Sequence, residues 1–159
     1  MAKFHALGTL LWQAGISRLW PALFAAVSVG LRRGEALGFT WNDVDFKEGI
    51  LNIQQQVTGH KGGARVGPLK TGNALREIHM PPSLVTLLQA HQIQQQAERS
   101  VLGLPWIVDG PVFATAEGKI THPDNINRAL GRLNDWSQKG ASAVPGHWWI
   151  SYPELRAAL

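Results

Sequence analysis

Apolar residues recur at helical spacing near the N-terminus and predict two helices that pack in a core. The first apolar face comprises Phe4, Leu7, Leu11 and Ala14. The second, at positions i, i+3, i+4 and i+7, comprises Trp20, Leu23, Phe24 and Val27. Gly30 then opens a turn that ends the second helix. A short third helix is expected from Arg32 to about Gly38.

Beyond this helix the pattern changes from helical to extended. Residues 40–45 are expected to form a polar turn, and residues 50–57 alternate with a period of two, which predicts a strand. A shorter extended segment is predicted over residues 74–80. The intervening residues 58–67 are rich in glycine and basic side chains. They are expected to form a mobile hairpin loop.

The second half of the chain returns to a helical pattern. A long helix is predicted from Pro81-Pro82-Ser83 to about Arg99, with Leu84, Leu87 and Leu88 facing inward. Thr121 is expected to be the N-cap of a further helix over residues 123–135. These elements together predict a mainly α fold with a small antiparallel β-sheet.

Composition narrows the class of protein. The chain carries 15 Lys and Arg against 11 Asp and Glu, a formal net charge of +4, which permits a polyanionic partner. Without cysteine, and with six histidines that lack zinc-ligand spacing, no metal or cofactor is expected. No signal-peptide core and no run of eighteen apolar residues is present. A soluble, cytoplasmic protein that does not contact a membrane is expected.

The segment Arg32-Arg33-Gly34-Glu35 is the first candidate for chemistry. Guanidinium groups supply paired N–H donors for phosphate oxygens, and a helix N-terminus adds partial positive charge. The segment therefore fits a phosphate-binding pocket. The alternative is a solvated helix start in which Arg32 and Glu35 form an ion pair at i,i+3.

The order of the motifs favours the first interpretation. The segment from Gly30 to Leu37 is followed by Trp41-Asn42-Asp43-Val44-Asp45, a small sheet, Pro68-Leu69-Lys70-Thr71-Gly72, Arg76-Glu77-Ile78 and Pro81-Pro82. This order resembles the catalytic domain of the tyrosine recombinases, the phage integrase family, over roughly residues 4 to 135.

The resemblance implies roles for particular residues. Arg32 matches the first active-site arginine, which stabilises charge on the scissile phosphate. Glu35 matches the acidic residue that orients this arginine, and Lys70 matches the lysine that protonates the departing 5′ hydroxyl. Arg156 matches the second arginine, in a box where Pro153 replaces the family's histidine.

A second set of residues is expected to bind DNA without taking part in catalysis. The set is Arg33, Lys61, Arg65, Thr71 and Arg76. Such contacts to the phosphate backbone give an affinity that depends on salt and not on base sequence. For Lys61 and Arg65 the alternative is that they are plain solvated charges.

The C-terminal residues depart from the family pattern. Tyr152 is the sole tyrosine, and it precedes the box instead of following it on a later helix. We therefore expect a partial catalytic domain over residues 1–138, an atypical tail over residues 139–159, and no N-terminal core-binding domain. Such a chain is expected to bind duplex DNA weakly, through phosphates, without cleaving it. The alternatives are an accessory DNA-binding module and a helical protein that self-associates through its apolar tail.

Overall fold

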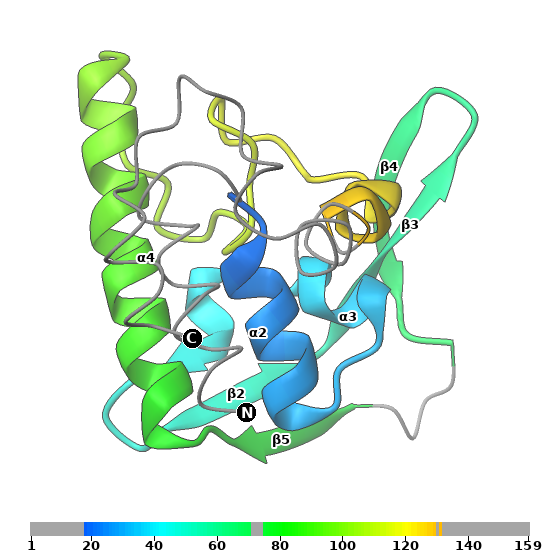
Figure 1. Ribbon diagram of the computed structural model, residues 1–159, viewed down its shortest axis with the longest axis vertical. Coiled ribbons are helices and arrows are strands. Elements are labelled where there is room, and N and C mark those ends of the chain that lie inside the picture. Colours follow the sequence, from blue (N-terminus) through cyan, green and yellow to red (C-terminus); the bar gives the residue numbers. More distant parts are fainter. Residues whose placement is uncertain (1–17, 71–74, 130, 132–159) are drawn as a thin grey trace, which may run out of the picture.

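The computed structural model describes residues 18–70, 75–129 and 131, which form helices and two small antiparallel sheets (Figure 1). The helices are α2 (Trp20–Val29), α3 (Arg33–Gly38) and α4 (Pro82–Val101), with a 3-10 helix at Trp41–Asp43. The strands are β1 (Val44–Asp45), β2 (Ile50–Ile53), β3 (Gln55–His60), β4 (Gly63–Pro68) and β5 (Arg76–His79). A further helical segment begins at position 123. The mainly helical fold with small antiparallel sheets agrees with the sequence prediction.

Helices α2 and α4 lie side by side and enclose the core with the three-stranded sheet (Figure 1). As predicted, α2 ends at Gly30, whose φ of 69° and ψ of 36° are left-handed. Leu84, Leu87 and Leu88 of α4 are buried, also as predicted. The prediction for Val27 was wrong, because its side chain is 54% exposed. The buried part of α2 is its first six residues, from Trp20 to Ala25.

The predicted strand over residues 50–57 is two strands that belong to different sheets. Strand β2 lies between β1 and β5, and Ile53 pairs with Arg76 at its end. Only two residues later, Gln55 begins β3 and pairs with Pro68 of β4. Leu51, Ile53 and Val57 are buried, so the period of two persists although the pairing partner changes at Gln54.

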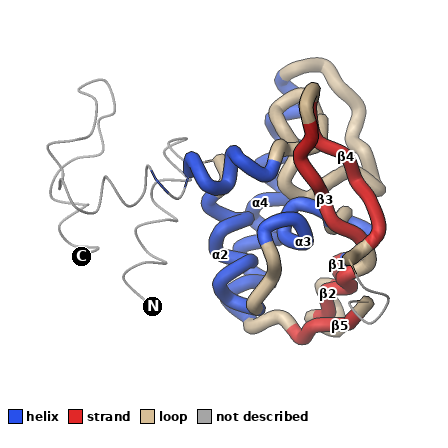
Figure 2. The backbone as a smooth tube through the Cα atoms, turned by 90° about the vertical axis from the view of Figure 1, so that its right-hand side faces the viewer, coloured by secondary structure: helices blue, strands red, loops and turns tan. Residues whose placement is uncertain are grey.

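The predicted hairpin loop over residues 58–67 is mostly strand. Thr58 pairs with Arg65 and His60 with Gly63, so the turn itself is confined to Lys61 and Gly62. The hairpin projects upward beyond the three-stranded sheet (Figure 2). Because these paired residues satisfy their backbone groups in the β3–β4 ladder, the high glycine content did not prevent strand formation.

Two local predictions need correction. The segment 40–45 is not merely a polar turn: Trp41 and Asp43 are buried, and Asp43 accepts hydrogen bonds from the backbone N–H (2.7 Å) and hydroxyl (2.9 Å) of Thr40. Thr121 does not cap the helix at position 123, because its hydroxyl donates to the Phe113 carbonyl at 2.6 Å. His122 takes that place, since its Nδ1 accepts from the Asp124 N–H.

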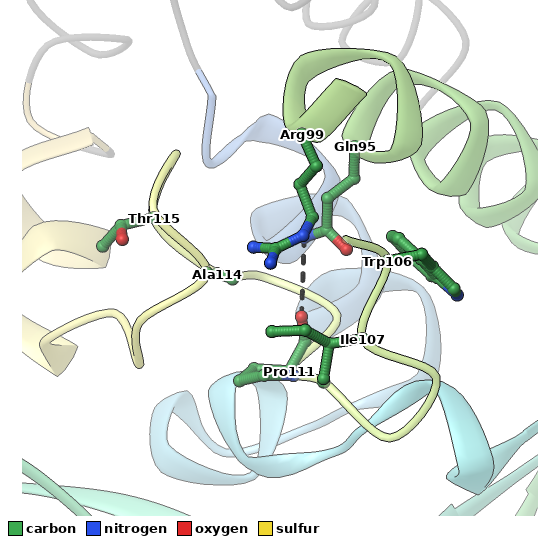
Figure 3. A pocket seen from close by; sticks show the side chains of 9 residues that line it. Gln95, Arg99, Trp106, Ile107, Pro111, Ala114 and Thr115 are labelled. Atoms are coloured by element: carbon green, nitrogen blue, oxygen red, sulfur yellow. Dashed lines mark hydrogen bonds between the residues drawn. The ribbon is translucent and has the colours of Figure 1, made fainter. Parts of the chain in front are cut away.

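Polar residues in the second half of α4 bind the loop that follows it and the 3-10 helix. Arg99 donates from Nε to the Pro105 carbonyl at 2.7 Å, and Gln95 accepts from the Trp41 indole N–H at 2.8 Å. Figure 3 shows both side chains descending from α4 towards Trp106 and Pro111 around a cavity of about 10 Å³. A cavity of this size holds about one water molecule. It is a feature of the core and is too small for a substrate.

Candidate functional site

Two glycines allow α3 to lie close to β3. A Cβ at Gly34 would lie 2.7 Å from the Val57 carbonyl oxygen, and one at Gly38 would lie 2.6 Å from that of Gln55. The Gln55 side chain also donates to the Gly38 carbonyl at 2.8 Å. Helix backbone therefore rests on strand backbone, which fixes α3 relative to the hairpin.

Glu35 is the centre of the charged cluster at this helix start. Its side chain is 1% exposed, and its Oε2 accepts from the backbone N–H of Arg32 at 3.0 Å. Arg76, from β5, donates to Oε2 at 2.8 Å and to Oε1 at 3.4 Å. The Arg32 guanidinium lies 3.6 Å from Oε1. The carboxylate thus joins the end of the Gly30 turn, α3 and β5.

The surroundings of Glu35 keep its carboxylate charged. Burial by itself raises the pKa of Glu35. The hydrogen bonds from Arg76 and from the Arg32 backbone, together with the positive charges of both arginines, outweigh burial and lower the pKa below its usual value. The carboxylate therefore stays ionised at neutral pH, where it hydrogen-bonds the Arg76 guanidinium and attracts that of Arg32.

Arg32 is the exposed member of the cluster. Its side chain is 67% exposed, and its one ion pair among the described residues is the long contact with Glu35. A guanidinium carries five N–H donors. Most of the donors of Arg32 thus remain accessible to an anion approaching from solvent, and a phosphate oxygen fits this geometry.

Arg33 points to a different partner. Its Nη1 lies 3.6 Å from Oδ1 of Asp124, whose Oδ2 lies 3.6 Å from Nδ1 of His122. The His122 ring in turn lies against β3, where a Cβ at Gly59 would be 2.8 Å from its Nε2. This chain of contacts connects α3, the helix that begins at position 123, and the hairpin. Exposed ion pairs at this distance add little stability.

Comparison with known proteins identifies the family. No family model matches the chain. It is 33% identical to a tyrosine recombinase XerC-like protein of Caldanaerobacter subterraneus subsp. tengcongensis over 128 residues, 73% of this chain and 33% of that protein. The chain belongs to the tyrosine recombinase and integrase family. An integrase of Streptomyces ambofaciens is 30% identical over 112 residues, 68% of this chain and 29% of the relative.

Solved integrase structures share the fold. The Tn1549 transposon integrase in complex with transposon right end DNA has a TM-score of 0.62 at 20% identity. The similarity covers 88% of this chain and 44% of that one. The chain spans about a third of the length of the curated relatives named above.

Of the other residues predicted to act in catalysis or DNA binding, some lie in the described part of the chain and others do not. Lys70 is exposed just after β4, Lys61 is exposed at the hairpin turn, and Arg65 is exposed on β4. Thr71, Arg156 and the tail over residues 139–159, with Tyr152, lie outside the described residues. The catalytic and DNA-binding roles of all these residues stay predictions.

Arg76 is the residue whose setting differs most from the expectation. Its expected contact with DNA stays a prediction, and in the structure its guanidinium forms a two-pronged hydrogen bond with the buried Glu35 carboxylate. These residues are 41 positions apart in the sequence. The only sequence signal for the pair was a basic residue at the start of a predicted strand, which does not specify its partner.

The remaining expectations concern metals and membranes. Among residues 18–70, 75–129 and 131, no group of three or more His, Asp or Glu side chains is arranged to hold a metal ion. No helix in the described part of the chain combines the length and the apolarity needed to cross a membrane.

Proposed function

We propose that this chain supplies the phosphate-binding part of a site-specific recombinase catalytic domain, and that it binds duplex DNA mainly through backbone phosphates. The observation that carries the proposal is the exposed Arg32 guanidinium, held at the start of α3 by the buried Glu35. Family membership and the solved complex of the Tn1549 integrase with transposon right end DNA support a DNA partner.

In this proposal each basic residue acts on a different part of the DNA backbone. Arg32 binds non-bridging oxygens of the phosphate that reacts in the family and stabilises the negative charge that develops there. Lys70, a flexible ammonium beyond β4, is the candidate proton donor to the leaving 5′ oxygen. Lys61 and Arg65 on the hairpin contact phosphates to either side. Arg156 and Thr71 keep the roles expected from the sequence.

Binding is tested by titrating a fluorescent duplex with the 159-residue protein at several salt concentrations. Affinity should fall as salt rises, and Arg32→Ala should reduce the slope of log K against log salt by about 0.9, the value for one phosphate contact. Arg128→Ala is the matched control, because Arg128 is exposed and, among the described residues, hydrogen-bonds only Asn125. Equal slopes for both variants would refute the role of Arg32.

We also propose that the 159 residues do not cleave DNA by themselves. The support is the position of Tyr152, which precedes the box-like segment and is the sole tyrosine present. Without a nucleophile at the family position, no phosphotyrosyl intermediate can form. Incubation with a nicked suicide duplex and a denaturing gel should show no covalent adduct. An adduct that disappears in Tyr152→Phe would overturn this proposal.

A further inference from the structure

Three donors compete for the two oxygens of Glu35. The Arg32 backbone N–H and the Arg76 guanidinium share Oε2, at 3.0 and 2.8 Å. Arg76 also donates to Oε1 at 3.4 Å, whereas the Arg32 guanidinium is 3.6 Å from that oxygen, outside hydrogen-bonding range. The short bonds to this carboxylate therefore come from Arg76 and from the backbone of Arg32, and not from the side chain of Arg32.

We propose that Arg76 is a positioning residue for the phosphate site: by binding both oxygens of Glu35, it keeps that carboxylate from capturing the Arg32 guanidinium. The inference rests on the proposed function, since it concerns the affinity of Arg32 for phosphate. A guanidinium bound at both prongs to a carboxylate presents fewer donors to another anion. With Arg76 in place, Glu35 orients the Arg32 side chain, but its negative charge does not neutralise the Arg32 guanidinium.

The backbone of the three residues is fixed by two elements, α3 with its N-cap and β5, so a small shift of one residue does not end the competition. Arg76 pairs with Ile53 in the β2–β5 ladder. Glu35 is buried in α3, and Arg32 immediately precedes that helix. If the fork of Arg76 is lost, the nearest remaining donor for Oε1 is the Arg32 guanidinium. That movement requires only a side-chain rotation.

The competition predicts that arginine at position 76 cannot be replaced by lysine. A lysine keeps the positive charge but is a point donor, so it does not span both oxygens. Arg76→Lys should therefore lower the affinity for duplex DNA by about tenfold, the effect of one charge-assisted hydrogen bond. The same substitution should have little effect in a Glu35→Gln background, where the competing negative charge is absent.

The experiment measures duplex affinity by fluorescence anisotropy at about 0.15 M salt, for Arg76→Lys with and without Glu35→Gln. Arg128→Lys is the control for an arginine-to-lysine change elsewhere on the surface, and thermal unfolding checks that each variant folds. Unchanged affinity in Arg76→Lys would overturn the inference. So would an equal loss in both backgrounds, which would mean that Arg76 itself contacts DNA.

A second measurement keeps the inference testable if the Glu35→Gln variant does not fold or the wild-type chain does not bind DNA. The NMR resonance of the Arg32 Nε–Hε group reports its hydrogen bonding directly and needs no DNA. It should shift in Arg76→Lys and stay in place in Arg128→Lys. If the resonance shifts but the chain does not bind DNA, the proposed function is refuted and the role of Arg76 stands. If the resonance does not move, the role of Arg76 is refuted.

Discussion

Replacing Gly38 by alanine should weaken the packing of α3 on β3, on which the geometry of the site depends. The new Cβ would lie 2.6 Å from the Gln55 carbonyl oxygen and 2.8 Å from the Cα of Gln56. Ordinary van der Waals contact begins at 3.4 Å, so the overlap with the oxygen is about 0.8 Å. Both neighbouring atoms belong to the backbone, so no side-chain rotation can relieve the clash.

The free energy of unfolding should fall by about 2 kcal/mol. Overpacking of this kind is unfavourable by about 1–3 kcal/mol. Displacing α3 also stretches the hydrogen bond from the Gln55 side chain to the Gly38 carbonyl, which contributes about 1 kcal/mol. Alanine is a better helix former than glycine by about 1 kcal/mol, which offsets part of the loss.

Urea unfolding followed by circular dichroism measures this change, and the melting temperature should fall by roughly 4–8 °C for a chain of this size. Gly67→Ala is the matched control, because a Cβ at Gly67 meets no atom within 4 Å. The control should change the free energy by no more than about 0.5 kcal/mol. If Gly38→Ala is as stable as Gly67→Ala, α3 does not rest on β3 as described.

Three further predictions concern buried polar groups. Burial lowers the pKa of His91 to about 4. As the pH falls, His91 is therefore protonated in the unfolded chain before it is protonated in the folded one, and the unfolding free energy should decrease by about 2 kcal/mol between pH 7 and pH 5. Urea unfolding at both pH values should show a smaller decrease in His91→Gln. Thr121→Val should lower the unfolding free energy by about 1–2 kcal/mol, because it removes the 2.6 Å hydrogen bond to the Phe113 carbonyl, and an unchanged urea midpoint would contradict this. Arg99→Met should lower the unfolding free energy by about 1–2 kcal/mol, because it removes the 2.7 Å hydrogen bond from Nε to the Pro105 carbonyl, and an unchanged melting temperature would refute that reasoning.

Features set by nearby residues could be predicted from the sequence. The end of α2 at Gly30, the short α3 helix and the inward leucines of α4 follow from glycine conformation and apolar spacing within one or two helical turns. The Arg32–Glu35 contact is local as well, since the two residues are three positions apart. Periodicity and spacing carry enough information for such features.

Features set by distant partners could not be predicted from the sequence. The alternation over residues 50–57 is continuous, yet the chain leaves one sheet and enters another at Gln54 because different strands supply the hydrogen bonds on either side. Thr121 was a good N-cap candidate by residue type, but a carbonyl eight positions away binds its hydroxyl instead. In both cases local preference was compatible with two outcomes, and tertiary contacts selected one.

The candidate site depends both on residues that are close in the sequence and on a partner that is distant in the sequence. Arg32 and Glu35 come from one short segment, but the charge balance between them depends on Arg76. This residue is 41 positions from Glu35 in the sequence, and the β2–β5 ladder places it beside the carboxylate. The local segment by itself therefore does not leave the Arg32 guanidinium free to bind a phosphate. In an isolated i,i+3 pair, the Arg32 side chain would bind Glu35 instead. Phosphate binding by Arg32 should thus depend on the integrity of the three-stranded sheet.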